Sequence, residues 1–198
     1  MVLFTARFLT TIFLAFTAVS IGSALPGDEP TSGFISDYLM QIDEVQKHIL
    51  SLENAIPEEK FGWRPAEGVR SISEVYLHIA FGNYLLLKFQ GTEPPADVAS
   101  MIDVMKVNEW DTSTKEKSAI ADRLTKSFEH LRSVASQMSE GELEKTADFF
   151  GQTVTKRNML LSCLSHLHEH LGQSIAYARM NGVVPPWTAA QQQQESGK

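Results

Sequence analysis

Apolar residues along the chain recur every three or four positions, which is the period of an amphipathic helix. The first such stretch covers about residues 31–55 and ends before Pro57. A second helix is predicted from Ser71 to about Gln90, because Ser71 and Glu74 have the spacing of a capping box. This second helix is apolar on most sides, a pattern that is typical of a buried helix.

Two more helices are predicted in the second half of the chain. One covers about residues 113–138, and the other runs from Asn158, as its N-cap, to about Asn181. Residues 96–112 between the second and third helices are ambiguous, with room for a short helix. Residues 153–155 are interpreted as a short extended piece before the last helix.

The chain of 198 residues has the length of one domain. Four long helices in an all-helical chain pack most simply as a four-helix bundle, which we expect over residues 31–187. Residues 188–198 include four consecutive glutamines and are predicted to form a disordered tail. The predicted fold class is therefore all-α.

The first residues have the pattern of a secretory signal peptide. A basic start that ends at Arg7 is followed by an uncharged apolar run from Phe8 to Gly22, and Ser23 and Ala24 are small residues suited to cleavage. A membrane anchor is disfavoured, because this run of about 15 residues is shorter than the ~20 that a spanning helix needs. We interpret residues 1–24 as a cleavable signal peptide and expect an exported protein, periplasmic or secreted, without a stable membrane anchor.

The charge and cysteine content exclude several kinds of binding partner and an internal disulfide. Removal of residues 1–24 takes away one Arg and no acidic residue, which shifts the formal charge from −7 to −8. An acidic chain without a basic stripe argues against binding to nucleic acid or to anionic membranes. The single cysteine, Cys163, cannot form an internal disulfide, and its apolar surroundings favour a buried side chain over a reactive thiol.

Candidate chemistry is concentrated in the histidines. His166 and His170 are four residues apart on a predicted helix, so both can lie on one face and bind one ion. His168 points away from that pair, since each residue turns a helix by about 100°. His78 lies in the nearly all-apolar second helix, where a neutral imidazole needs a partner. His78, His166 and His170 together predict a metal site with a fourth position open for water or substrate.

Other polar residues near these helices have simpler interpretations. Glu74, one turn before His78, either completes the helix cap or orients the second ring nitrogen of His78, and the cap is the favoured interpretation. His48 and His130 lie off the apolar stripes of their helices and are interpreted as solvated surface residues.

Two phrases of the sequence resemble the DinB-like (YfiT-like) superfamily. The first runs from Trp63-Arg64-Pro65 through the Ser71 cap to His78 and resembles its second-helix signature. The second, His166-Leu-His-Glu-His170-Leu-Gly-Gln, resembles its fourth-helix signature. The resemblance extends over about residues 32–187.

This resemblance implies a four-helix bundle with an up-up-down-down-like winding, a tendency to form homodimers, and a divalent metal, often zinc or nickel, on three histidines. By position, the metal ligands are His78, His166 and His170. Gly172 and Gln173 would let helices approach closely and would orient the surroundings of the metal. Known activities in the family include thiol-dependent S-transferases and mycothiol-dependent isomerases.

The favoured function is an exported metal-dependent hydrolase or transferase of an unidentified small molecule. An ion on three neutral histidines lowers the pKa of a coordinated water toward ~7. The alternatives are a non-catalytic metal-binding module and a helical scaffold whose histidines only hydrogen-bond. A thiol-dependent S-transferase is disfavoured, because low-molecular-weight thiols are scarce outside the cytosol. No general base is assigned among Glu74, His168 and Glu169.

Overall fold

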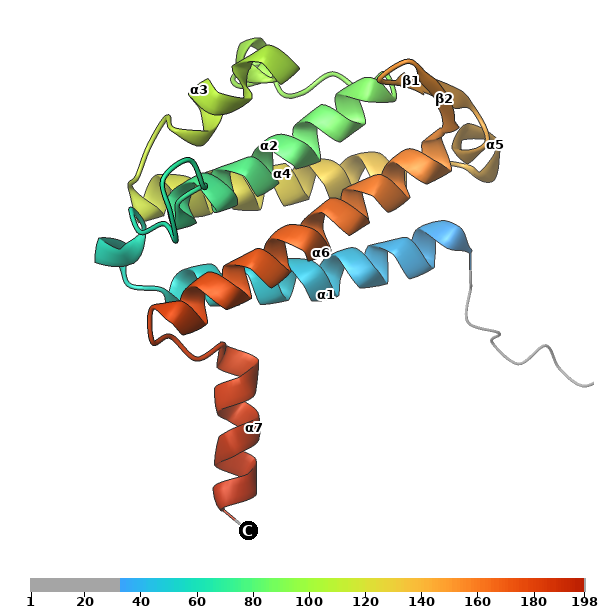
Figure 1. Cartoon of the computed structure of the whole chain (residues 1–198). Coiled ribbons are helices and arrows are strands. Elements are labelled where there is room, and N and C mark those ends of the chain that lie inside the picture. The colour runs from blue at the N-terminus through green and yellow to red at the C-terminus, as the bar shows by residue number, and fades with distance from the viewer. Residues whose placement is uncertain (1–32, 198) are drawn as a thin grey trace, which may run out of the picture. The chain divides into compact units, whose positions relative to one another are not determined.

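Four long helices form a bundle in the computed structural model, which describes residues 33–197 (Figure 1). They are α1 (Phe34–Ala55), α2 (Ile72–Phe89), α4 (Lys117–Ser136) and α6 (Lys156–Met180). The predicted helical bundle is confirmed. The predicted signal peptide at residues 1–24 lies outside the described residues. Within residues 33–197, no helix is both long and apolar enough to span a membrane.

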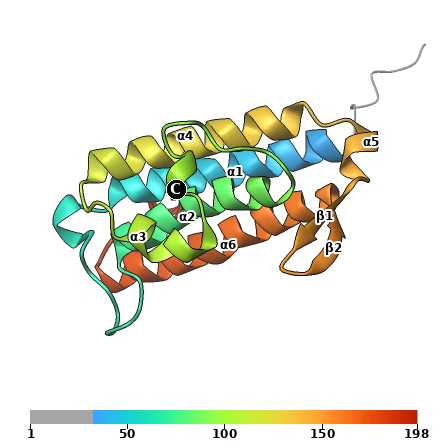
Figure 2. The same ribbon diagram turned by 90° about the horizontal axis from the view of Figure 1, so that it is seen from above.

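The four helices are not arranged in chain order around the bundle. α1 and α2 lie diagonally opposite, and each packs against both α4 and α6. α1 and α6 run in one direction, whereas α2 and α4 run in the other (Figures 1 and 2). In chain order this is up-down-down-up, which differs from the up-up-down-down-like winding that the resemblance implied. The connection at residues 90–116 returns along the bundle, so α4 starts at the same end as α2.

That returning connection contains the segment that the sequence left ambiguous. It holds two 3₁₀ turns, η2 (Ala99–Met101) and η3 (Val104–Lys106), followed by the short helix α3 (Val107–Asp111). Trp110 of α3 is buried, and its Nε1 donates a hydrogen bond to the Leu77 carbonyl oxygen of α2 at 2.8 Å. α3 is therefore fixed against α2.

The capping box predicted at the start of α2 is confirmed. Glu74 N donates to Ser71 Oγ at 3.4 Å, and Ser71 N donates to Glu74 Oε2 at 2.9 Å. The loop before this cap contains one further 3₁₀ turn, η1 (Glu58–Lys60).

α6 begins earlier than the sequence predicted. Thr155 Oγ1 accepts a hydrogen bond from Asn158 N at 3.1 Å, so Thr155 is the N-cap and Asn158 is already helical. Thr155 ends a strand, and its extended backbone (φ −78°, ψ 156°) is the conformation that an N-cap residue requires.

A β-hairpin precedes α6, where the sequence predicted only its second strand. After the short helix α5 (Glu140–Leu143), β1 (Thr146–Phe149) pairs antiparallel with β2 (Gln152–Thr155). The turn residues Phe150 and Gly151 both have positive φ, 52° and 80°. This is the pattern of a type I′ turn, which matches the twist of a hairpin.

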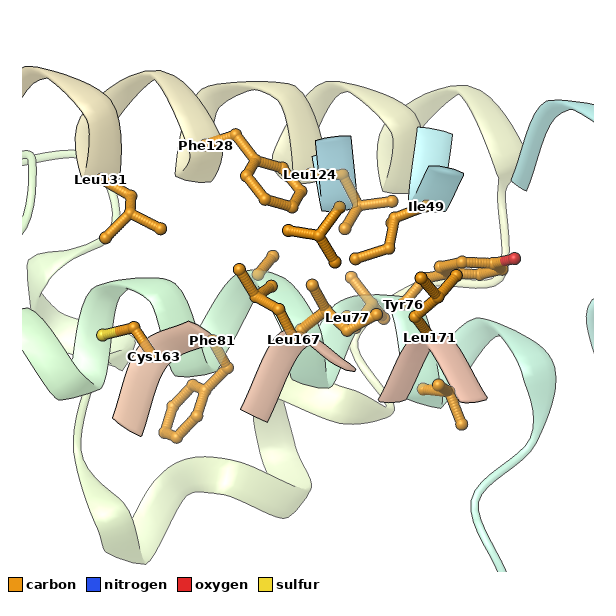
Figure 3. Close-up of a cluster of buried hydrophobic side chains, with 14 of the residues drawn as sticks. Ile49, Tyr76, Leu77, Phe81, Leu124, Phe128, Leu131, Cys163, Leu167 and Leu171 are labelled. Carbon is orange, nitrogen blue, oxygen red and sulfur yellow. The ribbon is translucent and has the colours of Figure 1, made fainter. Parts of the chain in front are cut away.

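The core fills the space between the four long helices (Figure 3). Its largest fully buried side chains include Phe61, Tyr76, Phe81 and Phe128. Cys163 also lies in this core, and burial raises the pKa of its thiol to about 12. The predicted buried cysteine is therefore confirmed.

The C-terminal segment is helical where the sequence predicted a disordered tail. α7 covers Pro186–Ser196, and its Trp187 packs on His48 of α1 with ring centroids 4.4 Å apart. Pro186 at the first helical position has a backbone angle already suited to a helix. The Ala and Gln residues that follow favour helix intrinsically.

Candidate metal centre

Three imidazole rings meet between α2 and α6. The ring centroid of His78 lies 5.2 Å from that of His166 and 4.9 Å from that of His170, and the two rings of α6 are 4.5 Å apart. One nitrogen of each ring lies within 4.8 Å of the others. The structure thus brings together the three histidines that the sequence singled out.

α2 makes room for one of these rings with a glycine. A Cβ atom at Gly82, one turn after His78, would lie 2.2 Å from Cε1 of His166. The ring of His166 therefore occupies the space that a side chain at position 82 would need. Gly172 has no such role, since a Cβ there would meet nothing within 4 Å. The close helix approach that the resemblance assigned to Gly172 is found at Gly82.

A buried carboxylate faces the second nitrogen of His78. Nδ1 of His78 lies 3.2 Å from Oδ2 of Asp111, which is only 4% exposed, and Arg70 Nε donates to the same oxygen at 2.8 Å. A carboxylate at Nδ1 favours the tautomer that carries its hydrogen there, which leaves the Nε2 lone pair for an ion. Asp111 belongs to α3, so the returning connection completes the site.

Glu74 does not perform this orienting role. Its Oε1 accepts a hydrogen bond from Arg64 Nη2 at 2.6 Å, while its Oε2 is used in the cap with Ser71. The favoured interpretation of Glu74 as a capping residue is confirmed.

His170 has an orienting partner of its own. Its Nδ1 lies 2.9 Å from Oε1 of Gln173, and Gln173 Nε2 donates to the hydroxyl of Tyr177 at 2.9 Å. Because the amide oxygen is an acceptor, Nδ1 of His170 carries the hydrogen and Nε2 is free to bind an ion.

The rings of His166 and His170 are neutral at neutral pH. Burial, together with smaller contributions from the neighbouring His170, His78 and Arg70, lowers the pKa of His166 to about 3. Burial also lowers the pKa of His170, which is 6% exposed. A neutral imidazole is the form that binds a metal ion.

Two buried ring nitrogens of this cluster make no hydrogen bond in the described part of the chain, and one of them, Nδ1 of His166, also faces no carboxylate there, whereas Nδ1 of His78 faces Asp111. Nδ1 of His166 is buried and accepts or donates no hydrogen bond within residues 33–197. Buried polar atoms almost always have a hydrogen-bond partner. A buried imidazole nitrogen without a partner in the protein is therefore expected where its partner is a metal ion. The cluster of neutral nitrogen donors therefore fits a divalent metal ion.

One cavity opens on His78 and His166 of this cluster, and a second lies beside the orienting residues Asp111 and Gln173. The first, with a volume of about 330 Å³, has mostly apolar walls and is lined by Arg70, His78, Phe81, Gly82, Leu85, Leu86, Val104, Val107, Phe150 and His166. The second, of about 620 Å³, is polar and is lined by Arg64, Gly68, Val69, Arg70, Glu74, Asn108, Asp111, Thr112 and Gln173. Arg70 lines both cavities.

The remaining described histidines lie outside the cluster. His168 is exposed, and its Nδ1 lies 3.0 Å from the Leu164 carbonyl oxygen. His48 and His130 are half-buried, so they are less solvated than the sequence analysis expected. His48 is covered by Trp187, and His130 packs beside Tyr84 with ring centroids 5.4 Å apart.

Comparison with known proteins identifies the family. The family model described as the DinB superfamily matches residues 41–174, which is more than half of the chain. The chain belongs to the DinB superfamily. No curated protein matches it.

Solved structures share the fold of this DinB-superfamily chain. A DinB-like protein from Bacillus cereus is 19% identical, with a TM-score of 0.62, over 77% of this chain and 93% of that one. YfiT from Bacillus subtilis is 16% identical, with a TM-score of 0.61, over 82% of this chain and 96% of that one. It is titled a probable metal-dependent hydrolase with an unusual four-helix bundle topology. A mycothiol-dependent maleylpyruvate isomerase is 17% identical, with a TM-score of 0.56, over 71% of this chain and 62% of that one.

Four residues of the site were missed by the sequence analysis of this DinB-superfamily chain. Asp111 and Arg70 are brought to His78 by long-range packing, Gly82 is placed against His166 by the α2–α6 contact, and Phe150 comes from the unpredicted hairpin turn. Gly82 could have been found by its spacing, because it lies one helical turn from His78 on the same face.

Proposed function

We propose that the protein is a metal-dependent enzyme, a hydrolase or a transferase, that acts on a small molecule at His78, His166 and His170. The observation that carries this proposal is that two of the three clustered histidines, His78 and His166, line a cavity of about 330 Å³. Catalytic metal sites keep one coordination position open, whereas structural sites are closed by protein ligands. The fold likeness to YfiT, titled a probable metal-dependent hydrolase, supports the same function.

A divalent ion held there would supply Lewis acidity and lower the pKa of a coordinated water to about 7. The chain itself orients the ligands, through Asp111 at His78 and Gln173 at His170. Apolar side chains around the cavity exclude bulk water, which strengthens electrostatic interactions inside it. His168 does not serve as a base in this proposal, because it is exposed and outside the cluster.

Zinc and nickel are the metals that we propose for this site. Imidazole nitrogen is a suitable ligand for both, and sites with three protein ligands and one open position are typical of catalytic zinc.

Export to the periplasm or the medium is a further part of this proposal and is supported by the N-terminal pattern of basic, apolar and small residues. Scarce low-molecular-weight thiols in that location favour a hydrolase over a thiol-dependent transferase. N-terminal sequencing of protein recovered from the producing cells tests this part. We expect a mature chain that begins near residue 25, whereas a chain that begins at Met1 would contradict export with cleavage.

The enzymatic proposal is tested by assaying chromogenic esters and amides with zinc-loaded, nickel-loaded and chelator-treated protein. We expect turnover that is lost on chelation, restored by the metal, and absent in a His166→Gln variant. A fully metal-loaded protein that turns over no member of a broad panel would favour the non-catalytic metal-binding module instead.

A further inference from the structure

The substrate class can be inferred from the walls of the apolar cavity. We propose that the substrate is an amphipathic carboxylate, whose apolar part occupies the cavity between α2 and the hairpin turn while its carboxylate binds Arg70. This inference rests on the proposed function, since it assigns the substrate of the same site. It also assigns Phe150 as a residue that contacts the substrate.

The cavity is suited to an apolar group of limited size. α2 contributes Phe81, Leu85 and Leu86, and the returning connection contributes Val104 and Val107. Its volume of about 330 Å³ is near the lower end of small-molecule pockets, which span roughly 300–1,000 Å³. A medium-length acyl chain or a single aromatic ring is therefore a better match than a polymer.

Phe150 completes this cavity from the hairpin turn, at a backbone position that does not favour phenylalanine. Its φ is 52°, and it is the only non-glycine residue within 33–197 with positive φ. Asn or Asp is preferred before Gly151 in such a turn, and a bulky residue there is unusual. Phe150 is also 65% exposed, so it adds little to the core. An unfavourable and exposed aromatic residue is better explained by contact with a ligand than by folding.

The aromatic neighbours of Phe150 hold its ring at the cavity. Its ring centroid lies 4.9 Å from that of Phe89 on α2 and 4.9 Å from that of Phe149. These contacts orient Phe150 toward α2, where the cavity continues to His78 and His166.

Arg70 supplies the one cationic side chain in the wall of this cavity. Its Nε donates a hydrogen bond to Oδ2 of Asp111, and its guanidinium makes no other hydrogen bond within residues 33–197. The terminal amino groups are therefore available, and the planar end of an arginine matches the two oxygens of a carboxylate. Arg64 does not compete for the anion, because it is engaged by Glu74 and by the Val69 carbonyl oxygen.

Calorimetric titration of zinc-loaded protein with octanoate and with its neutral analogue octanamide tests this inference. We expect octanoate to bind the native protein at least tenfold more tightly than octanamide. Arg70→Gln should remove most of this preference, while Arg70→Lys should retain part of it. A preference that survives unchanged in Arg70→Gln would show that the carboxylate binds elsewhere, for example to the ion, and would overturn the role of Arg70.

Phe150→Asn tests the apolar half of the inference. We expect this substitution to lower the affinity for both octanoate and octanamide about fivefold or more. The midpoint of thermal unfolding should stay unchanged or rise, because Asn adopts positive φ readily. Met40→Asn is the matched control, since Met40 is also an exposed large apolar residue but lines none of the cavities described above. Equal affinities in the native protein and Phe150→Asn would overturn the contact.

The metal content of the same samples separates the two proposals. Protein that carries one zinc ion per chain and binds neither octanoate nor octanamide would overturn the substrate class alone. Protein that retains no zinc under these conditions would count against the proposed function itself.

Discussion

Gly82 on α2 lies so close to His166 on α6 that a single methyl group at position 82 would sit 2.2 Å from the imidazole Cε1. Helices rarely keep glycine in their interior, because it is less favourable there than alanine by about 1 kcal/mol. Here the glycine allows the ring of one helix to reach the histidine of the other. The close approach of α2 and α6 is therefore part of the metal site rather than only of the core.

Gly82→Ala should therefore damage the site despite its higher helix propensity. We expect the added methyl group to displace the His166 ring, lower metal affinity by at least tenfold and destabilise the fold by about 1–3 kcal/mol through overpacking. Metal titration and urea unfolding of the variant measure both effects.

Gly172→Ala is the matched control, because Gly172 is also helical but a Cβ there meets nothing within 4 Å. Its metal affinity should be unchanged, and its free energy of unfolding should rise by up to about 1 kcal/mol. Equal metal affinities in the two alanine variants would contradict the steric role of Gly82.

Asp111→Asn should weaken metal binding without removing a ligand. The substitution keeps the shape but removes the charge that faces Nδ1 of His78, and loss of such an orienting partner typically costs about 10–100-fold in metal affinity. Glu74→Gln provides the comparison, because Gln can still complete a capping box. Competition with a chromogenic chelator should show the native affinity in Glu74→Gln, and a loss confined to Glu74→Gln would reverse the assignment of the two carboxylates.

The metal-free protein should lose stability as the pH falls below about 6.5. The pKa of His166 is lowered from 6.5 to about 3 by burial, so the unfolded chain binds more protons than the folded one between these values. The free energy of unfolding therefore rises with pH in this window, by at most about 1.4 kcal/mol per pH unit for one such group. Urea unfolding between pH 6.5 and 4 should show a shallower slope for His166→Gln than for the native chain. Identical slopes would mean that His166 titrates normally.

Cys163 should react slowly with alkylating reagents while the protein is folded. Burial raises the pKa of its thiol to about 12, and only the thiolate is nucleophilic. At pH 8 we expect labelling by iodoacetamide to be about a thousandfold slower in the native protein than in urea. Mass spectrometry of timed samples measures this ratio, and comparable rates in both states would show that the thiol is accessible.

The sequence was sufficient for features that depend on local periodicity. The helical period located all four long helices, the Ser71–Glu74 spacing located a cap, and the four-residue spacing of His166 and His170 placed them on one face. The contact of Asp111 with His78 could not be predicted from the sequence, because it forms only after the returning connection folds back along α2. Thr155 was missed as a cap because the hairpin that gives it an extended backbone was not predicted.

The central claim is that His78, His166 and His170 bind one metal ion together. Elemental analysis of purified mature protein, prepared with excess zinc or nickel and then dialysed, tests this claim most directly. His78→Ala and His170→Ala each remove one of the proposed ligands, and His168→Ala changes an exposed histidine two residues away from each α6 ligand. We predict one ion per chain in the native protein and in His168→Ala, and little or none in the other two variants, with all four chains helical by circular dichroism. Full metal content in both His78→Ala and His170→Ala, or none in the folded native protein, would contradict a single ion held by histidines from two helices.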